Sequence, residues 1–330
     1  MEVFIMKKIS RILALLMAVL MVMSLAACKE KTEEGATVTP NVYTLKGPTG
    51  MGMAQMISEN KEDAKYNFTV AASPEEITTA IISKDADIAA CPVNLASVLY
   101  NKTEGGVKLL ALNTLGVTYI VTNGVEVNSL EDLRGKTIVS AGQGATPEYI
   151  ITKLLTDSGM TVGEDVFVEF KSEHADVASL IVSGEAQIAL LPEPNVTSST
   201  VQNKELKVAL DLTKEWEAKY GSKLVQGCVI ARTEFVEENP DAVKAFLENY
   251  KESVEIINKA DDNAAKLIVE AGIIPKEPIA KKAIPTSYIT FITGEEMKTL
   301  TKDNLQVLFD ANPKSVGGAL PGDDFYYTQG

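Results

Sequence analysis

Residues 81–92, with the sequence IISKDADIAACP, recur at residues 181–192 as IVSGEAQIALLP. In each copy a segment with apolar residues at helical spacing is followed by a polar turn and an apolar run that ends at a proline. This order predicts the end of a helix, a tight turn and a short buried strand. The repeat predicts two lobes of similar architecture, and chance similarity between two amphipathic segments is the alternative.

A glycine-rich turn lies upstream of each copy. Residues 42–46 lead into GPTGMG at 47–52, and residues 136–140 lead into AGQGATP at 141–147. Each stretch predicts a strand, a glycine-rich turn and the start of a helix. Strands that alternate with helices predict α/β lobes, each a mainly parallel sheet flanked by helices.

The two lobes are expected to use the chain unequally. Residues 116–123 (GVTYIVTN) predict a strand between the lobes, and the second lobe closes near residues 226–231 (QGCVIA). A helical tail has no sheet of its own to cover, so we expect it to return to the first lobe. Its helices are predicted at 240–260, 261–271, 275–283 and 294–309. The expected division is lobe 1 at 41–119 plus 231–330 and lobe 2 at 120–230, with two crossings, near 118–122 and 226–231, that form a hinge.

The composition excludes several classes of function. The 330 residues contain 31 Lys+Arg and 45 Asp+Glu, a net charge of −14, and no basic patch of the size that nucleic acid requires is expected. The single histidine, His174, excludes a multi-histidine metal site and disfavours histidine-based catalysis. The chain also lacks GxSxG, P-loop and HExxH motifs. We therefore expect no metal, no cofactor and no enzymatic activity.

The N-terminus carries the features of a secretory signal. Three basic side chains within the first 11 residues precede an apolar run of 16 residues at 12–27. This run is shorter than the roughly 20 residues of a membrane-spanning helix, which predicts a signal peptide at 1–27. The run ends in LAAC at 25–28, which resembles the lipobox of bacterial lipoproteins and implies lipid attachment at Cys28. An ordinary signal with an incidental cysteine is the alternative, and Met6 is an alternative start.

The stretch that follows Cys28 is polar and lacks apolar periodicity. Residues 28–40 therefore predict a flexible tether between a membrane anchor and the folded body. A poorly ordered terminus without a tethering role is the alternative.

Four phrases carry a resemblance to a known family. They are GPTGMGM at 47–53, SLEDLRGK at 129–136, GQGATPEY at 142–149 and LPEP at 191–194. Together with the lipobox and the two-lobe order, they make the chain similar to the substrate-binding lipoproteins of ABC importers. The branch is that of the nitrate, sulfonate, taurine and thiamine-pyrimidine-precursor binders. SLEDLRGK is the best marker, since in that family it commonly opens the second lobe. The resemblance covers essentially the whole mature chain and implies a two-lobe periplasmic-binding-protein-like fold (type II), with a ligand cleft between the lobes.

The resemblance also implies a function. The protein would be the extracytoplasmic solute-binding component of an ABC importer, which captures a small molecule by hinge closure and delivers it to permease and ATPase subunits. It would act as a monomer, lipid-anchored on the outer face of the bacterial cytoplasmic membrane. A tethered receptor domain is the alternative that the sequence does not separate. A pyrimidine-synthase-like enzyme of the same fold, which would use histidines and iron, is disfavoured by the single histidine.

The predicted ends of the strands place candidate ligand contacts. In open α/β sheets ligands bind beyond the carboxyl ends of the strands, and glycines let backbone N–H groups approach them closely. The candidates at these ends are Thr49, Gly50, Met51, Cys91, Asn94, Tyr119, Gly144, Ala145, Thr146, Glu193, Asn195 and Gln226. Tight strand–helix turns without a ligand are the alternative.

Glu193 indicates a ligand class. It stands between Pro192 and Pro194, and a carboxylate held there would bind an amine or the edge of an aminopyrimidine through charge-assisted hydrogen bonds. Among the glycine-rich turns and the residues after the repeated strands, Lys46 alone is basic. A neutral or amine-bearing ligand is therefore favoured over a sulfonate or nitrate, and a surface glutamate is the alternative.

The two remaining cysteines, Cys91 and Cys228, are predicted at neighbouring edges of the cleft. Two interpretations stay open: a disulfide in an oxidising exterior, or two buried thiols that pack as small apolar residues.

Overall fold

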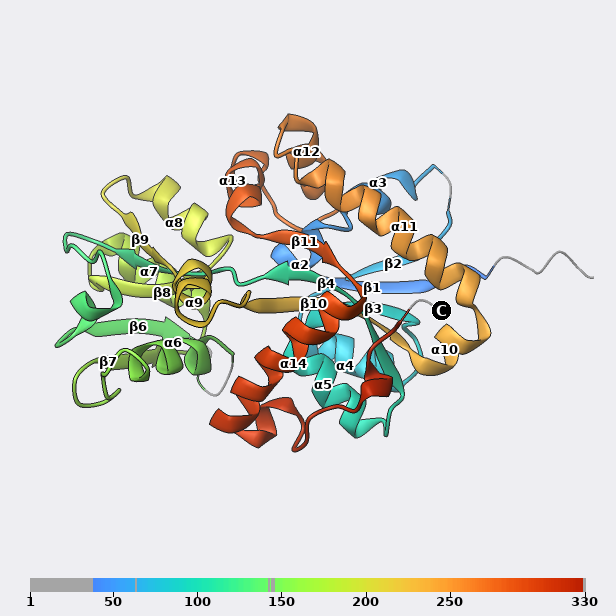
Figure 1. Ribbon diagram of the computed structural model, residues 1–330. Coiled ribbons are helices and arrows are strands. Elements are labelled where there is room, and N and C mark those ends of the chain that lie inside the picture. Colours follow the sequence, from blue (N-terminus) through green and yellow to red (C-terminus); the bar gives the residue numbers. More distant parts are fainter. Residues whose placement is uncertain (1–37, 63, 142, 144–145, 329–330) are drawn as a thin grey trace, which may run out of the picture. The chain divides into compact units, whose positions relative to one another are not determined.

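Two sheets organise the part of the chain that the computed structural model describes, which is residues 38–62, 64–141, 143 and 146–328. Both lie within one compact unit, Thr39–Gly330. Figure 1 shows them side by side, each flanked by helices. We call the part built on the first sheet lobe 1 and the part built on the second sheet lobe 2.

The sheet of lobe 1 has the strand order β11-β4-β10-β3-β1-β2. The strands are β1 (Asn41–Leu45), β2 (Asn67–Ala71), β3 (Ile88–Pro92), β4 (Val107–Leu115), β10 (Val225–Arg232) and β11 (Ile289–Ile292). The sheet of lobe 2 has the order β7-β6-β8-β5-β9. Its strands are β5 (Thr118–Thr122), β6 (Thr137–Ala141), β7 (Phe167–Lys171), β8 (Ile188–Pro192) and β9 (Lys207–Asp211).

The repeat seen in the sequence is a repeat of structure. The first copy spans the end of helix α4 (Pro74–Ile82) and strand β3, and the second spans the end of α7 (His174–Ser183) and β8. In both copies the serine hydroxyl of the turn donates to a carboxylate two residues on, Ser83 to Asp85 and Ser183 to Glu185. The parallel trios β2-β1-β3 and β7-β6-β8 have the same order.

Each sheet keeps the expected parallel trio and is mixed, because antiparallel strands are added to it. β10 runs antiparallel to β3 and β4, and β5 runs antiparallel to β8 and β9. Each of these strands reaches its sheet directly from the other lobe. It therefore enters at the edge where the parallel strands end and must run in the opposite direction.

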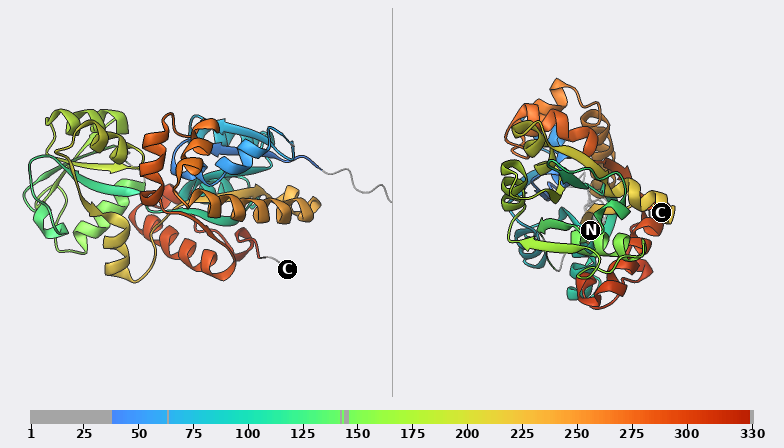
Figure 2. Two further views of the ribbon diagram at one scale, coloured as in Figure 1. Left: turned by 90° about the horizontal axis from the view of Figure 1, so that it is seen from above. Right: turned by 90° about the vertical axis from the view of Figure 1, so that its left-hand side faces the viewer.

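The helices cover both faces of the sheets (Figure 2). Those up to the end of lobe 2 are α2 (Pro48–Met51), α3 (Ala54–Glu59), α4, α5 (Val93–Lys102), the 3-10 turn η1 (Leu130–Leu133), α6 (Thr146–Thr156), α7, α8 (Asn195–Gln202) and α9 (Leu212–Tyr220). Residues 129–136 (SLEDLRGK) contain a capped turn, because Ser129 and Asp132 form a capping box on η1.

The C-terminal part returns to lobe 1. Its helices are α10 (Thr233–Glu238), α11 (Pro240–Ile257), α12 (Asp262–Glu270), α13 (Glu277–Ala283) and α14 (Gly294–Ala311), with the 3-10 turns η2 (Ile284–Thr286), η3 (Pro313–Val316) and η4 (Asp323–Phe325). Phe246, Tyr250 and Ile257 of α11 are buried in the core against lobe-1 residues such as Val42 and Val229, as their helical spacing predicts. The strand β11 was not predicted, because four residues between two helices give too short an alternating pattern.

Two short links join the lobes. Residues 116–117 connect β4 to β5, and residues 221–224 connect α9 to β10. The links are hydrogen-bonded to each other, because the Gly116 N–H donates to the Leu224 carbonyl at 2.8 Å. The segments expected to cross, 118–122 and 226–231, are themselves strands, and each link precedes its strand. The predicted crossings were misplaced by a few residues, because an apolar pattern indicates the strands and not the links that lead into them.

The two buried cysteines are free thiols on adjacent strands. Cys91 and Cys228 are directly opposite in the β3–β10 pair, and the Cys228 thiol donates to the Cys91 carbonyl at 3.5 Å. Burial raises the pKa of the Cys228 thiol, which disfavours the reactive thiolate.

We therefore expect both thiols to resist modification in the folded protein. Ellman's reagent should leave Cys91 and Cys228 unmodified under native conditions and react with them in 6 M guanidinium chloride. Modification in the native state at the rate of free cysteine would contradict the burial, and a failure to react after denaturation without reductant would indicate a disulfide.

Candidate functional site

The ends of strands from both sheets come together where the two links cross. β1 and β3 of lobe 1 are followed by α2 and α5, and β6 and β8 of lobe 2 are followed by α6 and α8, so the connecting turns lie at the carboxyl ends of parallel strands. The approach is close at Gly47, where a Cβ atom would lie 3.8 Å from Cδ of Pro194. This is the position at which open α/β sheets bind ligands. We call this region the interlobe site.

The glycine-rich turn after β1 is hydrogen-bonded to the strand β4. Asn113 of β4 is buried, and its Nδ2 donates to the Thr49 carbonyl at 3.0 Å. Gly50 is in contact with β1, and a Cβ atom there would lie 2.0 Å from the Leu45 carbonyl oxygen. The turn is therefore fixed by backbone contacts, with the Thr49 side chain only partly buried.

Glu193 connects the two lobes. Its Oε1 accepts hydrogen bonds from Thr286 Oγ1 at 2.6 Å and Thr197 Oγ1 at 3.0 Å, and its Oε2 accepts one from the Thr197 N–H at 3.1 Å. Thr197 belongs to the first turn of α8 in lobe 2, whereas Thr286 belongs to η2, which follows the lobe-1 helix α13. The side chain is 3% exposed, and burial raises the pKa of this carboxyl group. The carboxylate thus caps a helix, where negative charge is favoured, and bridges the lobes.

The segment around η2 makes further contacts with lobe 2 that the sequence did not indicate. Tyr119 Oη donates to the Thr286 carbonyl at 2.6 Å, and Tyr288 Oη donates to Asp211 Oδ2. Burial raises the pKa of both tyrosines, so they stay protonated donors. The polar triplet Thr286-Ser287-Tyr288 directly before β11 was the only signal for these contacts.

The remaining candidates divide into four groups. Met51 and Cys91 are fully buried core residues, although both were expected at the ligand. Asn94 donates from Nδ2 to the Ser315 carbonyl at 3.3 Å. Thr146 begins α6, Asn195 begins α8 and Gln226 lies at the start of β10, all at strand or helix ends that border the interlobe site. Gly144, Ala145 and Cys28 lie outside the described residues.

The described residues show no metal site and no membrane-spanning helix. No three His, Cys, Asp or Glu side chains among them are grouped to hold a metal ion. Every helix in this part of the chain is too short or too polar to cross a bilayer.

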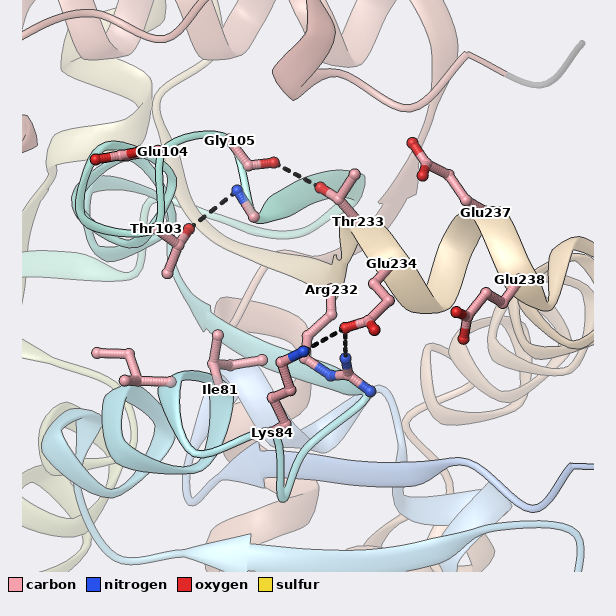
Figure 3. Close-up of a pocket in the computed structure, with 12 residues that line it drawn as sticks. Ile81, Lys84, Thr103, Glu104, Gly105, Arg232, Thr233, Glu234, Glu237 and Glu238 are labelled. Carbon is pink, nitrogen blue, oxygen red and sulfur yellow. Dashed lines mark hydrogen bonds and ion pairs between the residues drawn. The ribbon is translucent and has the colours of Figure 1, made fainter.

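A cavity of about 430 Å³ lies at the opposite end of the lobe 1 sheet, beside the last residue of β10 (Figure 3). The cations that border it are already paired. Lys84 Nζ lies 2.6 Å and Arg232 Nη1 lies 3.0 Å from Glu234, and Arg232 Nη2 lies 2.7 Å from Asp87. This ion-pair network stabilises the end of the sheet and leaves neither basic side chain free for a ligand.

Comparison with known proteins gives one family and one fold. A model described as NMT1/THI5 like matches residues 60–264. A protein of Brucella abortus (strain 2308), named as a binding protein, is 24% identical over 233 residues, which are 70% of this chain and 67% of the relative.

Two solved structures share the fold. An ABC transporter from Parabacteroides distasonis has a TM-score of 0.75 at 21% identity, over 88% of this chain and 99% of that one. The periplasmic aliphatic sulphonate binding protein SsuA from Escherichia coli has a TM-score of 0.69 at 12% identity, over 88% of this chain and 92% of that one. At such identities the likeness shows the two-lobe fold, as predicted.

Proposed function

Because this chain belongs to the NMT1/THI5-like family, we propose that it is the solute-binding component of an ABC importer. It captures a small molecule at the interlobe site and delivers it to a membrane permease, without catalysing a reaction. The names of the Brucella relative and of the two structural neighbours support this proposal.

One observation carries the proposal: two lobes built on the same parallel trio of strands meet at their strand ends and are joined by two short links. At Gly116 a Cβ atom would lie 2.5 Å from Thr213 Oγ1 and 2.7 Å from Leu224 Cδ2, so the links pack tightly against each other. Bending of paired links is a hinge motion in which the lobes close on a ligand.

The location follows from the N-terminal sequence. We propose that residues 1–27 direct the chain out of the cytoplasm and that Cys28 carries the lipid that anchors it to the outer face of the membrane. The acidic balance of the chain favours a neutral or amine-bearing ligand over nitrate or a sulfonate. The carboxylates of Glu193 and Asp211 add negative charge near the interlobe site, while their own oxygens accept hydrogen bonds from Thr286 and Tyr288.

The test is ligand-dependent stabilisation together with closure. Thermal shift with cytosine, an aminopyrimidine thiamine precursor, spermidine, taurine and potassium nitrate should identify a class that raises the melting temperature. A ligand at one hundred times its Kd adds about 2.7 kcal/mol to the free energy of unfolding. Small-angle scattering with that ligand should show a smaller radius of gyration. An unchanged radius would remove the support for closure, and stabilisation by taurine or nitrate alone would contradict the ligand class.

A further inference from the structure

Helix α14 returns toward the interlobe site after β11. Ile289 of β11 pairs with Thr114, near the end of β4, so β11 begins at the interlobe edge of the sheet and leads away from it. The chain turns at Thr293 and Gly294, and α14 runs back toward lobe 2, as Figures 1 and 2 show.

The length of α14 carries it past the edge of the sheet. The three steps from Ile289 to Ile292 span about 10 Å at about 3.3 Å per residue. α14 recovers that distance after about seven residues at 1.5 Å each, which is near Thr301. The rest of the helix extends beyond the sheet, and two contacts agree: Val307 packs against the core of lobe 2, and Asn312 Nδ2 donates to Tyr149 Oη of α6 at 2.9 Å.

Two polar residues occupy the centre of the buried face of α14 at this level. Thr301 and Asn304 follow Met297 by four and seven residues and precede Leu308 by seven and four, so all four share one face of the helix. Thr301 is 0% and Asn304 is 3% exposed. Neither amide atom of Asn304, nor the Thr301 hydroxyl, has a hydrogen-bond partner among the described residues.

A buried carboxamide without partners is costly, and most buried polar side chains are hydrogen-bonded. We propose that Asn304, supported by Thr301, is a recognition residue of the interlobe site whose partner is the captured solute. The inference rests on the proposed function and extends it to a residue outside the glycine-rich turns.

The carboxamide also defines the chemistry of the group that it binds. Asn304 offers one acceptor, Oδ1, beside one donor, Nδ2. Both are satisfied by a group that presents a donor next to an acceptor, as in a primary amide, a lactam, a ureide or an aminopyrimidine edge. Nitrate and sulfonate ions present acceptors alone and would leave Oδ1 unpaired.

The deciding variant is Asn304→Leu, which has a similar shape and no polar atoms. The matched control is Ser253→Ala on α11, because Ser253 is also buried with an unpartnered hydroxyl but belongs to the opposite, α11-covered face of lobe 1. The probes are cytosine, nicotinamide, allantoin, taurine and potassium nitrate, followed by the small-molecule fraction of a bacterial cell extract. Thermal shift detects binding, and calorimetry gives the Kd for a pure probe.

We expect the wild-type protein and Ser253→Ala to bind the same probe. Asn304→Leu should weaken binding at least tenfold, while its own melting temperature without probe stays equal to or above that of the wild type. Binding by Asn304→Leu within twofold of the wild type would overturn the assignment and leave the proposed function intact. A response confined to taurine or nitrate would overturn the donor–acceptor chemistry. A wild-type protein that responds to no pure probe and to no extract would overturn the proposed function itself.

Discussion

Replacement of Gly50 by alanine should lower the free energy of unfolding by about 3–5 kcal/mol, the range of the most damaging single substitutions. The added Cβ atom would lie 2.0 Å from the Leu45 carbonyl oxygen and 3.2 Å from Thr44 Oγ1. The closest atom is backbone at the end of β1, so it cannot rotate away as a side chain would. Relief of the clash must displace the turn that leads into α2, and with it the hydrogen bond from Asn113 to Thr49.

The matched control is Gly322→Ala. Gly322 has a φ of −72°, and its added Cβ atom would lie 2.7 Å from Asp324 Oδ1 and 3.3 Å from Tyr100 Oη, which are both at the ends of side chains. We expect a loss below about 1 kcal/mol there, typical of substitutions away from tightly packed features. Urea unfolding followed by circular dichroism measures both. An equal decrease in the free energy of unfolding of the two variants would contradict the predicted effect of the contact with Leu45.

Replacement of Glu193 by alanine should have the second large effect and lower the free energy of unfolding by about 2–4 kcal/mol. It removes a carboxylate and leaves the Thr197 N–H and the Thr197 hydroxyl without their acceptor, and unpaired buried groups carry a full desolvation cost. The Thr286 hydroxyl loses its bond to Glu193 and keeps the Ala283 carbonyl as an acceptor at 3.2 Å. Thr286→Val is the comparison, because it removes the hydroxyl that donates to Glu193 and leaves both contacts of Glu193 with Thr197 in place; it also removes the contact of that hydroxyl with the Ala283 carbonyl at 3.2 Å. A smaller loss for Thr286→Val, together with a larger radius of gyration in both variants, would establish Glu193 as helix cap and bridge.

The same carboxyl group gives stability a definite dependence on pH. Its pKa is raised by burial, so the folded protein holds the proton more tightly than the unfolded chain. The corresponding stability is fully present below the unfolded pKa and is lost as the pH rises through the folded pKa. The stability of Glu193→Gln relative to the wild type should therefore increase from pH 4 to pH 8. The glutamine variant also tests the predicted contact with an amine or aminopyrimidine ligand, which it should abolish.

Much of this molecule follows from local patterns in its sequence. The repeat at 81–92 and 181–192 predicted the two lobes, since it records a helix, a turn and a buried strand in the same order twice. The helices α11 to α14 of the tail were predicted within a few residues, because apolar spacing such as Phe246, Tyr250 and Ile257 is a local property; the short helix α10 was not predicted.

Long-range contacts explain what the sequence did not predict. The sequence predicts a ligand contact for Glu193 and gives no sign of its partner Thr286, which is 93 residues away. Asn304 was overlooked, because a single polar residue in an amphipathic helix is ordinarily placed on the solvent side. Its proposed role depends on the return of α14 past the edge of the sheet, which is a property of the fold and not of the local sequence.

β5 follows lobe 1 in the sequence but belongs to the sheet of lobe 2, and β10 follows lobe 2 but belongs to the sheet of lobe 1. This arrangement constrains how the protein can fold. β10 lies between β3 and β4 in the middle of its sheet, so the first lobe lacks a central strand until the chain has been made as far as Arg232. The contacts of β10 with β3 join residues more than 130 positions apart, such as Cys228 and Cys91, and such distant pairings slow folding. A nascent or truncated chain that ends before Val225 exposes the unpaired edges of β3 and β4. The two lobes therefore depend on each other for completion and should acquire their native structure together.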